Sequence, residues 1–114
     1  MIINLEFYWI IDKNKEGTFL WLSSVMAFEC EQVKVIAESR IVLNIKDNKK
    51  LIFVYGENCG EDGYWLDKSE SNIEFLDLKC HVDHRDHVLA SKIISPNGVI
   101  FEVKENYKGN DIRK

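Results

Sequence analysis

Residues 88–103 read VLASKIISPNGVIFEV, and this stretch decides the fold class. Two apolar runs, residues 88–94 and 99–103, flank a turn segment at 95–98. The Asn-Gly pair in that segment supplies the positive φ angles of a tight turn, and Pro96 fits just before it. The stretch therefore predicts a β-hairpin.

Strand patterns extend from this hairpin toward the N-terminus. Residues 2–11 are rich in β-branched and aromatic residues. Because apolar residues occur at both odd and even positions, we expect a strand that is buried on both faces. Residues 32–45 alternate, residues 47–49 read as a turn, and residues 50–55 return as a second strand. Residues 72–80 alternate imperfectly, as an edge strand does. The expected inward row of the first strand is Ile3, Leu5, Phe7 and Trp9.

Two segments depart from this pattern. Residues 18–28 fit both a strand and a helix face, and we expect a strand followed by a short helical or irregular piece. Residues 56–63 contain three glycines and predict a loop. Together the patterns predict a single domain over residues 1–114, of class α+β. We expect a predominantly antiparallel β-sheet of meander-type hairpins with at most one or two short helices.

Composition narrows the functional classes. The chain has 114 residues, a net charge of −4 and an ordinary apolar content of 46 %. This acidic balance argues against nucleic-acid binding, which depends on Lys and Arg. Residues 17–28 form the longest uncharged stretch, too short for a membrane span, and residues 1–6 do not resemble a signal peptide. Because the chain has an odd number of cysteines (Cys30, Cys59 and Cys80) and no CxxC pair, we expect a reduced, cytoplasmic protein.

The net charge is unevenly distributed along the chain. Residues 1–56 have a net charge of 0, residues 57–77 a net charge of −6, and residues 78–114 a net charge of +2. Within 57–77, Lys68 is the one basic residue. The acidic residues of this segment are Glu57, Glu61, Asp62, Asp67, Glu70, Glu74 and Asp77.

Two interpretations of this acidic segment compete. It can be a loop and edge strand kept soluble by charge. Alternatively, it can be a binding face for a basic partner, in which the carboxylates steer association while Tyr64 and Trp65 provide anchoring contact area. The second interpretation makes the seven acidic residues, Tyr64 and Trp65 the candidate partner-binding residues.

Enzymatic and ligand-binding alternatives have weaker signals. His81, His84 and His87 could converge on a metal only in a helix or folded loop, which would suit a small metal-dependent hydrolase. Cys80 and His81 point to opposite faces of a strand and so make a poor nucleophile–base pair. The aromatic residues could line a small-molecule cavity, although they occupy positions that a core fills anyway. We expect no catalytic residue, no metal and no cofactor.

In overall type, the chain resembles the immunity proteins that bacteria pair with secreted toxins, including those of contact-dependent growth inhibition systems. The resemblance rests on a small, acidic domain without catalytic machinery and on segment 57–77 with Tyr64 and Trp65. It implies tight binding of a cognate toxin domain, commonly a nuclease, whose basic cleft Asp and Glu side chains would occupy in place of phosphates. No membrane or nucleic-acid partner is implied, and the oligomeric state stays open.

Overall fold

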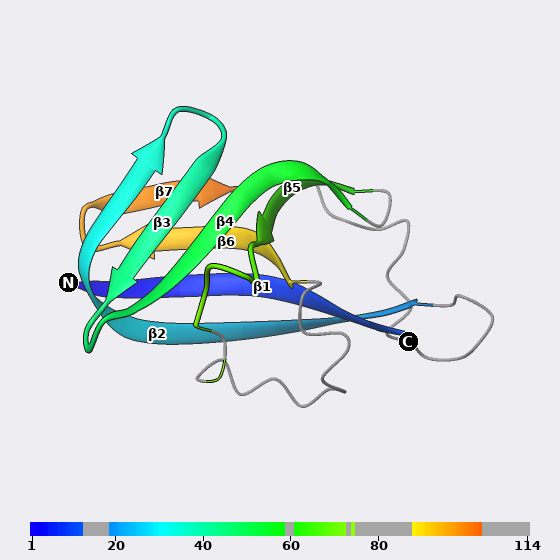
Figure 1. The fold of residues 1–114 in the computed structure, drawn as a ribbon, viewed down its shortest axis with the longest axis horizontal. Coiled ribbons are helices and arrows are strands. Elements are labelled where there is room, and N and C mark those ends of the chain that lie inside the picture. Colours follow the sequence, from blue (N-terminus) through cyan, green and yellow to red (C-terminus); the bar gives the residue numbers. More distant parts are fainter. Residues whose placement is uncertain (13–18, 59–60, 73, 75–87, 104–114) are drawn as a thin grey trace.

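The computed structural model describes residues 1–12, 19–58, 61–72, 74 and 88–103, and its secondary structure consists of antiparallel strands (Figure 1). Each strand pairs with the next one along the chain. The described residues contain no α-helix, so the α+β class and its short helices are not confirmed, whereas the antiparallel sheet is. The strands are β1 (Ile2–Asp12), β2 (Phe19–Ile36), β3 (Arg40–Ile45), β4 (Lys49–Asn58), β5 (Glu61–Leu66), β6 (Val88–Ser95) and β7 (Gly98–Glu102).

The sheet closes on itself because β6 pairs with both β5 and β1. Ala90 marks the closure: it lies opposite Phe7 on β1 and opposite Tyr64 on β5. Strands β1 to β6 thus form a closed ring, and β7 extends the sheet from β6. Closure leaves the ring strands without a shared open edge and encloses one row of side chains from each of them.

Alternating residues of the strands fill the interior of this ring. The inward row predicted for β1 is confirmed, since each of its members is at most 6 % exposed. Side chains from β3 to β6 pack against that row, and Met26 and Phe28 of β2 complete it from partly buried positions. The buried cluster is Ile3, Leu5, Phe7, Trp9, Cys30, Ile41, Leu43, Ile45, Leu51, Phe53, Tyr64, Leu66, Val88, Ala90 and Ile93.

The hairpin at residues 88–103 is confirmed as β6 and β7. Ser95 and Gly98 are paired across the turn, so Pro96 and Asn97 lie between the strands. Of the Asn-Gly pair, Gly98 alone takes a positive φ, of 132°. A residue with a side chain would be strained there, which explains the glycine.

Four local predictions were wrong. Residues 32–45 are not one strand, because a turn at 37–39 separates β2 from β3. Residues 19–36 form one continuous strand without a helical piece. Exposed and buried side chains alternate along it, with Val25 exposed and Met26 packed on the core, and this alternation outweighs the helical pattern. The glycine-containing segment 56–63 is a hairpin, in which Gly56 pairs with Gly63. Strand β1 is not buried on both faces, since Ile2 is 50 % exposed. The edge strand expected at 72–80 lies almost entirely outside the described residues.

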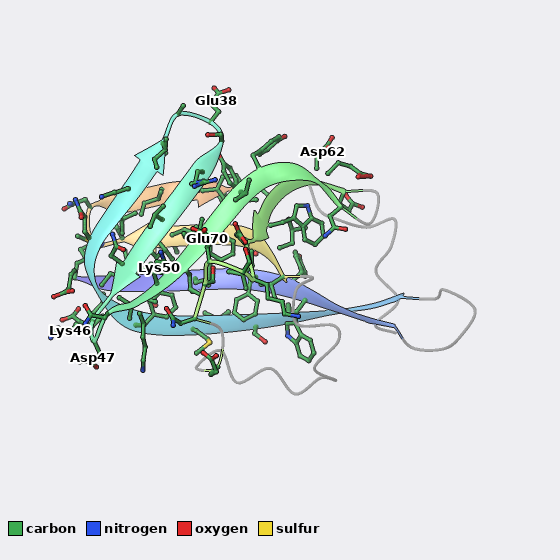
Figure 2. The ribbon with its side chains drawn as sticks, viewed as in Figure 1. Glu38, Lys46, Asp47, Lys50, Asp62 and Glu70 are labelled. Atoms are coloured by element: carbon green, nitrogen blue, oxygen red, sulfur yellow. The ribbon has the colours of Figure 1, made fainter. Side chains whose placement is uncertain are left out.

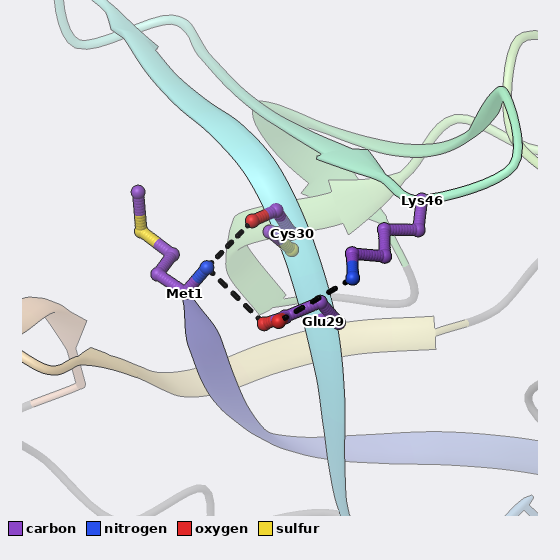
Figure 3. A network of polar contacts seen from close by, with 4 residues as sticks. All are labelled: Met1, Glu29, Cys30 and Lys46. Carbon is purple, nitrogen blue, oxygen red and sulfur yellow. Dashed lines mark hydrogen bonds and ion pairs between the residues drawn. The ribbon is translucent and has the colours of Figure 1, made fainter.

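A polar network holds the point where β2 changes partner (Figure 3). β2 pairs with β1 up to Glu29 and with β3 from Cys30 onward, with an irregularity between Cys30 and Gln32. The ammonium group of Met1 donates to the carbonyl oxygen of Cys30 at 2.9 Å and lies 3.1 Å from Oε2 of Glu29. Lys46 Nζ lies 3.8 Å from Oε1 of the same carboxylate. The direct contact of the Met1 ammonium group with the carboxylate, together with the positive charges of Met1 and Lys46, holds the pKa of Glu29 below its ordinary value.

Cys30 is expected to be an unreactive thiol in the folded chain. It is 1 % exposed, and burial raises the pKa of its thiol to about 11 from 9.0, so about a hundredfold less thiolate forms at mildly alkaline pH. In a Cys59→Ser/Cys80→Ser background, labelling by a disulfide reagent should be at least about a hundredfold slower in the native state than in urea. Equal rates in both states would contradict the burial of Cys30.

Candidate functional site

The acidic segment does not form one continuous loop. Glu57, Glu61 and Asp62 lie at the end of the β4–β5 hairpin, whereas the rest of the segment follows after the buried part of β5. Figure 2 shows Asp62 at the hairpin end and Glu70 apart from it, near the middle of the view. Glu74, further along the chain after β5, is exposed, and Asp77 lies outside the described residues.

The register of the hairpin places two carboxylates directly opposite each other. Tyr55 pairs with Tyr64, and two positions further along Glu57 pairs with Asp62. Since paired residues of an antiparallel ladder share a face, Glu57 and Asp62 continue the face on which Tyr55 and Tyr64 lie. Both carboxylate residues are exposed. The two acidic residues are therefore neighbours on one exposed part of this face.

The prediction that Tyr64 and Trp65 supply exposed anchoring area is wrong for this structure. They are 7 % and 6 % exposed. Tyr64 belongs to the core cluster inside the ring, whereas Trp65, the next residue of the strand, lies on the opposite face of β5. The Tyr64 ring packs edge-on against Tyr55 and Phe101, with centroid distances of 5.2 and 4.8 Å. Burial, with a smaller contribution from the charge of Glu38, raises the pKa of Tyr64. Trp65 Nε1 donates to the carbonyl oxygen of Glu61 at 3.1 Å.

Asp67 has a structural role in the turn that follows β5. Its Oδ1 accepts hydrogen bonds from the backbone N–H of Ser69 at 3.1 Å and from the Ser69 hydroxyl at 2.7 Å. The chain then runs along the edge of β4, where Asn72 bonds both backbone groups of Lys50. Asp67 is therefore engaged in shaping the turn, while Glu70 is exposed beside it.

Sequence reasoning missed two exposed apolar residues, one on β2 and one on β4. Tyr55 is 51 % exposed and Val35 is 55 % exposed, although both extend the rows of residues that face the interior. Glu38, in the turn between β2 and β3, was missed as well, since the charge of residues 1–56 is balanced overall. How Val35, Glu38 and Tyr55 are placed relative to one another depends on the strand register, which cannot be predicted from the local sequence pattern.

The alternative sites receive no support from the described residues. No group of three or more His, Cys, Asp or Glu side chains in that part of the chain could hold a metal ion. The histidines predicted to ligate one, His81, His84 and His87, lie outside it, as do Cys59 and Cys80. The aromatic residues Phe7, Trp9 and Phe53 belong to the packed interior.

A hollow of about 310 Å³ lies at the opposite end of β4 from the hairpin end. Its lining is mainly polar and mostly exposed: Glu31, Gln32, Asn44, Ile45, Asn48, Lys49 and Lys50.

Comparisons with known proteins give no relative from which a function can be transferred: no family model, no curated protein and no solved structure matches the chain. Among the residues that the structure describes, no helix is long and apolar enough to cross a membrane. The candidate site thus rests on the hairpin end itself, with Glu57 and Asp62 as its acidic pair.

Proposed function

We propose that the chain is a protein-binding inhibitor that neutralises a basic partner domain, in the manner of an immunity protein acting on its cognate toxin. The partner expected on chemical grounds is a nuclease-type domain, whose cleft carries Lys and Arg for a phosphate backbone. The inhibitor would act in the cytoplasm, where a buried free thiol such as Cys30 stays reduced.

The observation that carries this proposal is the opposition of Glu57 and Asp62 across the hairpin end. Two exposed carboxylates on neighbouring strands present negative charge at one place, which a basic cleft would attract. Lys and Arg side chains of a partner would be attracted to both exposed carboxylates.

The test begins with the cells in which the protein occurs naturally. The full chain, Glu57→Lys and Glu31→Lys are immobilised separately and exposed to the same native extract. Glu31 is a matched control because it is an exposed glutamate of β2 that is remote from the hairpin end. It lines the hollow together with Lys49, the first residue of β4. We expect one basic protein to be retained by the wild type and by Glu31→Lys but lost with Glu57→Lys.

The retained protein is then purified and assayed with the chain. The proposal requires a one-to-one complex and loss of the partner's own activity on mixing. Retention that is equal on all three surfaces, or a complex that leaves the partner active, would refute the acidic-face inhibitor.

A further inference from the structure

Resting on the proposed function, we infer that Val35 and Tyr55 form the apolar anchor of the interface, and that Glu38 and Glu57 form its charged rim. We call these four residues the β2–β4 patch. The patch is expected to bind a basic protein surface on which an aliphatic or aromatic side chain is surrounded by Lys or Arg. This assignment replaces Tyr64 and Trp65, which are buried.

The strand register brings the two apolar residues to the same end of the sheet. Val35 pairs with Ile41, and Ile41 pairs with Phe53, two residues before Tyr55. The backbone N–H of Tyr55 donates to the carbonyl oxygen of Ser39 at 2.8 Å, which fixes Tyr55 beside the turn between β2 and β3. Val35 and Tyr55 therefore flank Ile41 on the inward face, where the ladder ends and the side chains emerge from the core.

The exposure of these residues is unusual for their position. Ile41 between them is 2 % exposed, whereas Val35 and Tyr55 are each more than half exposed. An apolar side chain that extends a core row into solvent gains stabilisation when another surface covers it, at roughly 25 cal/mol per Å² of apolar area. Tyrosine is also among the residues that most often dominate binding energy at interfaces.

Charge complementarity identifies the kind of surface that would cover them. Glu38 lies in the turn beside Tyr55, and Glu57 follows Tyr55 by two positions on the same face. Both carboxylates are exposed; Arg40, which pairs with Val54, is the nearby basic residue of β3. An apolar centre with an acidic rim is complementary to an apolar protrusion with a basic rim, and it disfavours acidic or purely apolar partners.

The experiment uses a phage-displayed library of random cyclic peptides, selected against the immobilised full chain. Selected peptides are synthesised, and their affinities are measured for the wild type, Val35→Ser, Tyr55→Ser, Glu57→Lys and Val25→Ser. Val25 is the matched control because it is an exposed valine of the same strand, paired with Glu6. Thermal melts by circular dichroism verify that each variant is folded. Since Tyr55 also packs on Tyr64, Val35→Ser decides the test if Tyr55→Ser does not fold.

We expect the selected peptides to combine Lys or Arg with an aromatic or aliphatic residue, and to bind Val35→Ser and Tyr55→Ser at least about tenfold more weakly. Val25→Ser should bind as the wild type does. Basic peptides that bind Val35→Ser and Tyr55→Ser as tightly as the wild type, but do not bind Glu57→Lys, would overturn this inference. That result would leave the proposed function standing. No retained peptide, or peptides without basic enrichment, would count against both.

Discussion

Phe53→Ala is expected to lower the free energy of unfolding by about 3–5 kcal/mol. Phe53 has no exposed surface and lies on the central strand β4, opposite Ile41 on one side and Leu66 on the other. Truncation removes the transfer free energy of the ring and leaves a cavity that a closed sheet cannot collapse, because its strands are held on both edges by hydrogen bonds.

Urea unfolding followed by circular dichroism measures this loss. Val25→Thr serves as the control: it keeps a β-branched shape at a position 68 % exposed, and should stay within about 0.5 kcal/mol of the wild type. A loss below about 1 kcal/mol for Phe53→Ala would mean that the interior is not packed as described.

Ala90→Glu is expected to prevent cooperative folding at neutral pH. Ala90 is completely buried where β1, β5 and β6 meet, opposite both Phe7 and Tyr64. A carboxylate there is desolvated without a partner, at a cost of several kcal/mol, comparable with the whole stability of a small domain. Burial raises the pKa of an introduced carboxyl in the folded state, so its penalty should fall as the pH falls below that pKa.

The matched control for this closure test is Ala27→Glu. Ala27 is an exposed alanine on β2, paired with Asn4, so the same substitution meets solvent there. Thermal melts at neutral and acidic pH should show a cooperative transition close to that of the wild type for Ala27→Glu. A cooperative, neutral-pH melt for Ala90→Glu would contradict the closed ring.

The local sequence pattern was sufficient to predict much of the sheet. The alternation of Ile3, Leu5, Phe7 and Trp9 identified the buried row of β1 because burial on one face requires a period of two. The SPNG segment identified the β6–β7 hairpin because it places proline and glycine between two apolar runs, and Gly98 takes the positive φ angle next to the turn. These features depend only on neighbours in sequence.

The features that the sequence did not reveal depend on long-range pairing. Gly56 and Gly63 indicate a loop when considered alone, yet they face each other within a ladder that continues to Asn58 and Glu61. Strand β2 remains extended past the helix-like spacing of its apolar residues because it has β1 and then β3 as partners. Tyr64 belongs to the core because β5 is part of the ring that β6, from more than twenty residues later in the chain, completes.

The candidate site shows the same division. The concentration of acidic residues in 57–77 was evident from counting, and the structure distributes them between a hairpin end and a turn. That Glu57 faces Asp62, and that Tyr55 and Val35 flank Ile41, follows from register. The composition predicted an acidic face; the fold identifies which residues of it lie together.

The most direct test of the acidic-face account is the association rate constant of the purified partner, measured by stopped flow over a salt series. For the wild type and Glu31→Lys, the account predicts a rate that falls at least about tenfold from low salt to about 0.5 M salt. For Glu57→Lys it predicts a slower rate at low salt and a shallower dependence on salt. Identical rates and salt dependences for Glu57→Lys and the wild type would contradict the proposal that this hairpin end binds the partner.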